Sequence, residues 1–302
     1  MRLALVGLVA VVAATPSVTA PGNVTTLAMD GANVAFAVEK LPRDCDRIWL
    51  WNRTSGKLVR FPRPSSCIST STGHGIASVS IARTRLLWLH FTGGNIREWT
   101  LYTATTTVPK PRRLAFVARN VDAPPPIVLG EGHSFLRYGS SLPYAVDRNV
   151  VVLDARGARR GAWRESERVT AIAGAREAVA VATADGRVSI RESSDWTKVA
   201  DSWTDPRPAS AIFFSGTSVV AQRGRTIDVR AAGSTRRVTV PAGAVLRDAA
   251  GTRALYTSRG RVTLLDLDSG ATRDLGPGTA AQLEYSTVAV ASGARIRAFR
   301  PQ

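Results

Sequence analysis

Short runs in which apolar and polar residues alternate recur along most of the chain. In one clear example, the run from Ala178 to Gly186 ends in a glycine turn, and a second alternating run starts at Arg187. Alternation with a period of two is the pattern of a half-buried β-strand, and glycine turns between such runs indicate hairpins. Long stretches with helical periodicity are absent from the sequence, so the pattern predicts an all-β protein.

The paired runs form a repeating unit of two strands joined by a tight turn such as Gly-Arg. The second strands of these units begin near residues 47, 96, 148, 187, 225, 261 and 294, at spacings of 33 to 52 residues. Repeats of this length built from short strands are typical of β-propellers, whose blades bury their faces against each other. We therefore expect a single β-propeller, with seven blades of four antiparallel strands.

The two ends of the chain indicate how this ring closes. The last unit supplies only three strands, around residues 281–284, 288–291 and 295–299, before the sequence ends. An unpaired outer edge is a liability that folded sheets avoid. We expect the segment from Pro16 to Ala20 to join the last blade as its fourth strand.

Two hairpins carry a resemblance to known propellers. Leu265-Asp-Leu-Asp-Ser-Gly-Ala-Thr-Arg-Asp-Leu275 and Leu50-Trp-Asn-Arg-Thr-Ser-Gly-Lys-Leu-Val-Arg60 resemble the strand-turn-strand element of the WD40-like and TolB-like seven-bladed propellers. The resemblance covers roughly residues 24 to 300. The Gly-His and Trp-Asp signatures of WD40 repeats are missing, and Asp195-Trp196 has the reverse order. The resemblance therefore implies the fold and no particular partner.

The N-terminus has the layout of a secretory leader. Arg2 precedes an apolar run from Leu3 to Ala14, and small residues follow. Twelve apolar residues are too few to span a bilayer, and no later run reaches 18, so we expect an exported protein without a transmembrane anchor. Cleavage fits after Ala14 or after Ala20. Because Pro21 would follow the second cut, we favour a leader over residues 1–14 and a propeller domain over residues 15–302.

Cys45 and Cys67 are the only cysteines, and in an exported chain we expect them to form a disulfide in the first blade rather than two free thiols. The histidines, His74, His90 and His133, lack the spacing of a metal site. We expect no bound metal and no cofactor.

The net charge is +17, divided almost evenly between the two halves of the chain. Of the 40 basic residues 36 are arginine, a bias that is typical of a GC-rich genome and leaves a solvated basic surface. The alternative is attraction to polyanions. Charge distributed so evenly does not select a polyanion, and nucleic acid is not the partner that we expect.

Two classes of function stay open. The nucleophile-elbow, phosphate-loop and dinucleotide-loop patterns are absent from the sequence. The seven tryptophans could form a stacking platform or fill the wedges between blades. We expect a monomeric, non-catalytic binding or scaffold protein for a protein, a peptide or a cell-envelope glycan. The alternative is a lactonase-like hydrolase or a lyase acting at the central channel.

Long insertions suggest where binding occurs. They fall at residues 41–46, 62–75, 118–126 and 139–147, in two classes of connection that share one face in the propellers that this chain resembles. Loops on a rigid scaffold commonly carry recognition residues, and tyrosine and arginine combine apolar area with directed hydrogen bonds. The candidate ligand-binding residues within these insertions are His74, Arg119, Arg137, Tyr138 and Tyr144. The alternative is that the insertions are merely tolerated.

Overall fold

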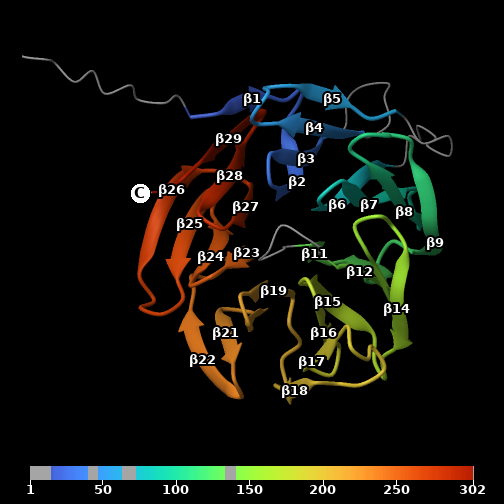
Figure 1. The fold of residues 1–302 in the computed structure, drawn as a ribbon, viewed down its shortest axis with the longest axis vertical. Helices are drawn as coiled ribbons and strands as arrows, with labels where there is room; N and C mark the ends of the chain where they lie inside the picture. The colour runs from blue at the N-terminus through green and yellow to red at the C-terminus, as the bar shows by residue number, and fades with distance from the viewer. Residues whose placement is uncertain (1–14, 40–46, 63–72, 133–140, 302) are drawn as a thin grey trace, which may run out of the picture.

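The computed structural model describes residues 15–39, 47–62, 73–132 and 141–301. All regular elements in these ranges are β-strands, and they form seven sheets arranged radially around a central axis (Figure 1). The protein is a seven-bladed β-propeller, as the repeat spacing predicted. The third strands of the blades begin at residues 48, 96, 149, 187, 226, 261 and 295, each within one residue of the predicted start.

The first four blades follow one another along the chain. Blade 1 contains β2 (Val24–Asp30), β3 (Asn33–Val38), β4 (Ile48–Asn52) and β5 (Leu58–Arg60). Blade 2 contains β6 (His74–Ala82), β7 (Arg85–Thr92), β8 (Ile96–Thr105) and β9 (Arg112–Asn120). Blade 3 contains β10 (Ile127–Leu129), β12 (Leu142–Val146), β13 (Asn149–Leu153) and β14 (Arg159–Arg164). Blade 4 contains β15 (Val169–Gly174), β16 (Ala178–Thr183), β17 (Arg187–Glu192) and β18 (Asp201–Thr204).

The last three blades complete the ring. Blade 5 contains β19 (Ala211–Ser215), β20 (Ser218–Arg223), β21 (Thr226–Ala231) and β22 (Ser234–Thr239). Blade 6 contains β23 (Val245–Ala250), β24 (Arg253–Ser258), β25 (Arg261–Asp266) and β26 (Thr272–Pro277). Blade 7 contains β27 (Ala280–Glu284), β28 (Thr287–Ser292), β29 (Arg295–Phe299) and, from the other end of the chain, β1 (Ser17–Thr19).

The N-terminal strand closes the ring, as expected from the sequence. β1 pairs antiparallel with β29, with Ser17 opposite Arg297 and Thr19 opposite Arg295. Backbone hydrogen bonds extend this pairing on both sides, because Ala298 donates to Pro16 at 2.9 Å and Ala20 donates to Ala294 at 2.7 Å. The segment from Pro16 to Ala20 is therefore part of the fold.

The hydrophobic core consists of seven separate clusters, and each lies between two neighbouring blades. All seven tryptophans belong to these clusters, and none of them is exposed. The tryptophans therefore fill the wedges between blades. Blade-to-blade hydrogen bonds reinforce the packing near the axis, where Met29 donates its N–H to Gln282 and Leu246 donates to Gln222.

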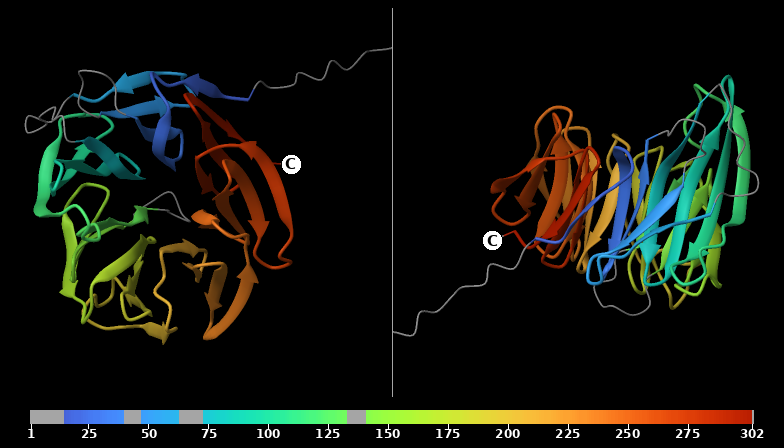
Figure 2. Two further views of the ribbon diagram at one scale, coloured as in Figure 1. Left: turned by 180° about the vertical axis from the view of Figure 1, so that it is seen from behind. Right: turned by 90° about the horizontal axis from the view of Figure 1, so that it is seen from above.

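The two faces of the ring carry different connections, because successive strands of a blade run in opposite directions. The connection face carries the turns between second and third strands and the links to the next blade. The opposite face carries the turns between first and second strands and between third and fourth strands. Figure 2 shows the ring edge-on, with the strands running between these two faces.

One predicted insertion differs in the structure. Residues 142–146 of the proposed loop at 139–147 are strand β12, which crosses blade 3 from one face to the other. The inserted residues instead precede β12, and β11 (Glu131–Gly132) within them pairs parallel with the inner strand β15 of blade 4. Ser141 donates its N–H to Ala175, beside the turn between the first and second strands of blade 4. Gly132 and Ser141, the described residues on either side of positions 133–140, therefore lie at the opposite face, and the chain enters β12 from that face.

Candidate functional site

The candidate ligand-binding residues that the structure describes do not come together in one site. His74 begins β6 and is 6% exposed, and Tyr144 lies in β12 at 8% exposure within the cluster between blades 2 and 3. Burial raises the pKa of the Tyr144 phenol above its ordinary value. The prediction that Tyr144 lies on a loop is wrong, because alternation along β12 turns this side chain into the core.

Arg119 lies near the end of β9, on the outer strand of blade 2, and forms an ion pair with Asp147. Asp147 occupies the turn between β12 and β13 and has a φ of 55°. The pair links neighbouring blades on the connection face. Arg137, Tyr138, Cys45 and Cys67 fall outside the described residues, so their proposed roles stay predictions.

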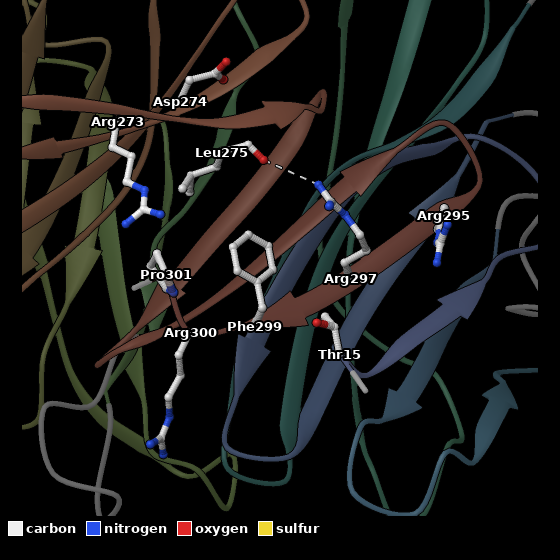
Figure 3. Close-up of a pocket in the computed structure, with 9 residues that line it drawn as sticks. All are labelled: Thr15, Arg273, Asp274, Leu275, Arg295, Arg297, Phe299, Arg300 and Pro301. Atoms are coloured by element: carbon white, nitrogen blue, oxygen red, sulfur yellow. Dashed lines mark hydrogen bonds between the residues drawn. The ribbon is translucent and has the colours of Figure 1, made fainter. Parts of the chain in front are cut away.

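A groove at the rim of the propeller gathers more potential ligand-binding side chains than these positions do. A cavity of about 560 Å³ opens between blades 6 and 7, and Figure 3 shows the nine residues that line it. We call it the seam groove, and its lining residues are Thr15, Arg273, Asp274, Leu275, Arg295, Arg297, Phe299, Arg300 and Pro301. They come from β26, from β29 and the residues after it, and from the segment that precedes β1.

The alternation of β29 explains why arginines meet here. Ile296 and Ala298 face blade 1 and are buried in the cluster between blades 7 and 1. The intervening side chains of Arg295, Arg297 and Phe299 face blade 6 and line the groove. Among the described residues, the cluster between blades 6 and 7 contains seven buried members, the fewest of any seam, and no tryptophan. The outer part of this seam is thus left open.

The groove has an excess of positive charge. Arg297 donates to the Leu275 carbonyl at 3.5 Å, and its guanidinium carbon lies 5.5 Å from the centre of the Phe299 ring. Within the part of the chain that the structure describes, Arg273, Arg295 and Arg300 have no ion-pair partner.

The one carboxylate of the groove is already engaged. Asp274 pairs with Arg261, which lies outside the groove, and its Oδ1 accepts the N–H of Gly276 at 2.9 Å. The Arg261 guanidinium holds the pKa of this carboxyl below its ordinary value. Asp274 is therefore neutralised by Arg261, and the four arginines of the groove leave it with a net charge of about +4.

The groove also has an apolar floor. Leu275 and Phe299 are half-buried and pack against the cluster between the two blades, and Pro301 is half-buried as well. A second cavity of about 220 Å³ shares Arg273 and Pro301 with the groove and continues it over the opposite face of blade 6. Guanidinium groups above an apolar floor suit a ligand that combines anionic and apolar groups.

A third cavity lies elsewhere and is less suited to binding. It has a volume of about 410 Å³ on the opposite face of blade 2, and its basic residues are Arg85, Lys110 and Arg112. Arg85 is already held, because it donates to the carbonyl of Arg156 in blade 3. This cavity therefore presents fewer available arginines than the seam groove.

The described ranges contain no group of three or more histidine, cysteine, aspartate and glutamate side chains that could hold a metal ion. The same ranges contain no helix that is long and apolar enough to cross a membrane. The chemistry that the described cavities offer is anion binding by guanidinium groups.

The sequence contains a signal for half of this site. Arg295, Arg297 and Phe299 alternate within a predicted strand, so they must share one face of it. Sequence reasoning missed the groove because Arg273 belongs to another blade, and because nothing local indicates that the seam between the two blades is incompletely filled.

Comparisons with known proteins agree on the fold alone. No protein-family model and no curated protein matches the sequence. A chain of a structure described as "Crystal Structure of Mitotic Checkpoint Complex" superposes with a TM-score of 0.61 at 16% identity, covering 95% of this chain and 92% of that one. The computationally designed Ika8 protein superposes with a TM-score of 0.54 at 14% identity, covering 95% of this chain and 100% of that one.

The propeller fold implied by the resemblance to WD40-like and TolB-like proteins is confirmed, and membership of either family stays a prediction. At these identities the solved structures establish a shared β-propeller architecture and assign no family.

Proposed function

We propose that this protein is an exported, non-catalytic β-propeller that binds an acidic segment of a partner protein in the seam groove. The observation that carries the proposal is the convergence of four arginines on a cavity whose only carboxylate is engaged by Arg261. An arginine guanidinium presents donors in a planar fork that matches a carboxylate. Acidic side chains are thus the ligands that would satisfy these donors.

The apolar floor favours a protein segment over a nucleic acid. Proteins that bind single-stranded nucleic acid combine a basic groove with aromatic rings on which successive bases stack. The only aromatic ring in the seam groove is Phe299, which is half-buried and lies under Arg297. Recognition of acidic motifs by arginine clusters needs no such stack. Leu275, Phe299 and Pro301 would accommodate an apolar side chain between the acidic ones.

Export is supported by the N-terminal sequence and by the position of β1. The charged and apolar layout of residues 1–14 ends immediately before the segment that closes the ring. Cleavage after Ala14 would leave Pro16 and β1 in place, whereas cleavage after Ala20 would remove the outer strand of blade 7. We therefore place the mature N-terminus at Thr15.

The first test measures binding of a synthetic acidic peptide, Asp-Glu-Glu-Leu-Asp-Glu-Glu, by isothermal titration calorimetry. The double variant Arg273→Ala/Arg295→Ala removes two exposed guanidinium groups, one from each wall. Because each charged contact contributes on the order of 1 kcal/mol, we expect binding to weaken by about tenfold or more.

The matched control is Arg164→Ala/Arg225→Ala, which removes two exposed arginines from blades 3 and 5. The control should leave the affinity within about twofold of the parent, and the amide peptide Asn-Gln-Gln-Leu-Asn-Gln-Gln should not bind. Equal weakening by both variants would mean that only net charge matters, and would sink the proposal. Tighter groove-dependent binding of an oligonucleotide of uridine would assign the site to nucleic acid.

A further inference from the structure

The seam groove is built partly from the segment that closes the ring. Thr15 is exposed and lines the groove together with Arg297 and Phe299 (Figure 3). Pro16 follows it directly and accepts the backbone N–H of Ala298 in β29. Thr15 is also the residue that becomes the N-terminus when a leader over residues 1–14 is removed. The position of leader removal and the binding groove therefore coincide.

We propose that removal of the leader between Ala14 and Thr15 completes the groove, because the released α-amino group of Thr15 becomes a further cation that binds the ligand. This inference rests on the proposed function of the groove. It adds a regulation of that site, in which the precursor binds an acidic segment more weakly than the processed protein.

The chemistry follows from hydrolysis of one peptide bond. Before cleavage the nitrogen of Thr15 is a neutral amide with a single N–H. A leader peptidase adds water across the bond, so that Ala14 departs with the leader as a carboxylate and Thr15 retains the nitrogen as an ammonium group with three donors. This nitrogen is one bond of about 1.5 Å from the Thr15 Cα and so stays at the groove.

The charges around Thr15 make this ammonium group sensitive to pH near neutrality. Arg273 and Asp274 face the groove from β26, Arg295 and Arg297 face it from β29, and Arg300 follows β29. Asp274 is engaged by Arg261, so arginines dominate. An α-amino group ordinarily has a pKa of about 7.7 to 8.0, and nearby positive charges lower it. A bound carboxylate favours the ammonium form, so affinity should fall as the pH rises through this pKa.

The test uses the specific reaction of periodate with an N-terminal threonine. Periodate cleaves the Cα–Cβ bond of Thr15 and is reduced to iodate, while acetaldehyde and ammonia leave and a glyoxylyl group remains. Oxidation thus removes the positive charge of the N-terminal ammonium group and leaves the residues after Thr15 unchanged. We expect the acidic peptide to bind roughly fivefold more weakly after oxidation at pH 6, which corresponds to about 1 kcal/mol. The difference between untreated and oxidised protein should disappear at pH 9.

A chain that begins at Ala14 is the matched control, because its N-terminus lacks the amino alcohol and does not react with periodate. Treatment should leave its affinity unchanged, which accounts for side reactions elsewhere. N-terminal sequencing of the exported protein should identify Thr15, and an N-terminus at Pro21 would overturn the inference.

The outcomes also separate this inference from the proposed function. If oxidation leaves the affinity unchanged while Arg273→Ala/Arg295→Ala abolishes binding, the groove binds acidic segments without help from Thr15, and the inference fails alone. If neither change affects binding, both proposals fail.

Discussion

At the scale of residues, a network of ion pairs joins blade 5 to the segment that links it to blade 4. Arg223 and Asp228 are fully buried, with the arginine Nε 3.3 Å from the aspartate Oδ2. Arg237 bridges Asp228 and Asp205, at 3.1 Å and 2.8 Å. Asp205 also accepts the backbone N–H of Arg207 at 3.0 Å, at the start of the link to β19. Each buried charge here has a partner of opposite sign, which offsets the cost of desolvation.

Asp205 should make the free energy of unfolding depend on pH in the acid range. Its hydrogen bonds hold its pKa below the ordinary value, first through the backbone N–H of Arg207. A lowered pKa stabilises the fold at pH values above the ordinary value of about 3.9, and the contribution is lost as the pH falls through the folded-state pKa. We expect Asp205→Asn to lower the free energy of unfolding by about 1 kcal/mol at pH 7, because its guanidinium partners are partly exposed.

Urea unfolding at pH 7 and at pH 3 measures this effect. The difference in stability between the parent and Asp205→Asn should be smaller at pH 3, because the carboxyl is then mostly protonated in the unfolded state and the contribution of its lowered pKa is partly lost. Asp122→Asn, in an exposed loop, controls for the loss of one charge. A difference that persists undiminished at pH 3 would contradict the assignment.

At the scale of elements, the short strand β1 has two structural roles. It covers the outer edge of β29, and Val18 packs against the cluster between blades 7 and 1. The same segment places Thr15 at the seam groove. One element therefore closes the ring and shapes the candidate site.

Replacing Val18 by aspartate should destabilise the ring. The charge would enter a half-buried position without a partner, and we expect the free energy of unfolding to fall by about 2 kcal/mol. Val199→Asp is the matched control, because Val199 is 38% exposed and should tolerate the change. Denaturant unfolding compares the two variants. Equal stability of both variants would show that β1 contributes little to closure.

At the scale of the whole molecule, the propeller is a ring of seven seams with one discontinuity in the chain. In each of blades 1 to 6 the four antiparallel strands follow one another along the chain, whereas blade 7 joins strands from the two ends of the chain through three residue pairs. The neighbouring seam between blades 6 and 7 has the fewest buried apolar residues among those that the structure describes. Local opening should therefore begin at this side of the ring.

Hydrogen exchange measured by mass spectrometry tests this expectation. Amides of β1 and β29 should exchange faster than those of β18 and β17, the strands at the same positions in blade 4. Saturating acidic peptide should slow the exchange of β29, because a ligand that binds only the closed ring stabilises it. Uniform exchange across these four strands would contradict a preferred point of opening.

Much of the architecture could be predicted because the signals for it are local. The period-two alternation and the turn glycines reveal strands without knowledge of their neighbours. The start of β17 at Arg187 and the three strands of the last blade were predicted from these signals. The missing fourth strand of that blade then pointed to residues 16–20, since an open sheet edge is unfavourable wherever it occurs.

The candidate site could not be predicted in the same way, because it depends on how neighbouring blades pack. The sequence places Tyr144 on a loop, but the chain crosses blade 3 at this point as strand β12, and the phenol side chain of Tyr144 is buried between blades 2 and 3. Gly161 shows how strictly a seam is filled, since an added Cβ would lie 2.4 Å from Trp196 Cδ1 in the next blade.

Alternation along the chain specified the strands, their number and the closure of the ring, because the pleat of a strand is a local property of the backbone. Only the assembled ring decided that the seam between blades 6 and 7 stays open and that Arg273 meets Arg295 and Arg300 there. Arg273 lies more than 20 positions from the other two arginines and on a different blade. Whether such a seam fills depends on the side-chain volumes of both blades, which no single stretch of sequence contains.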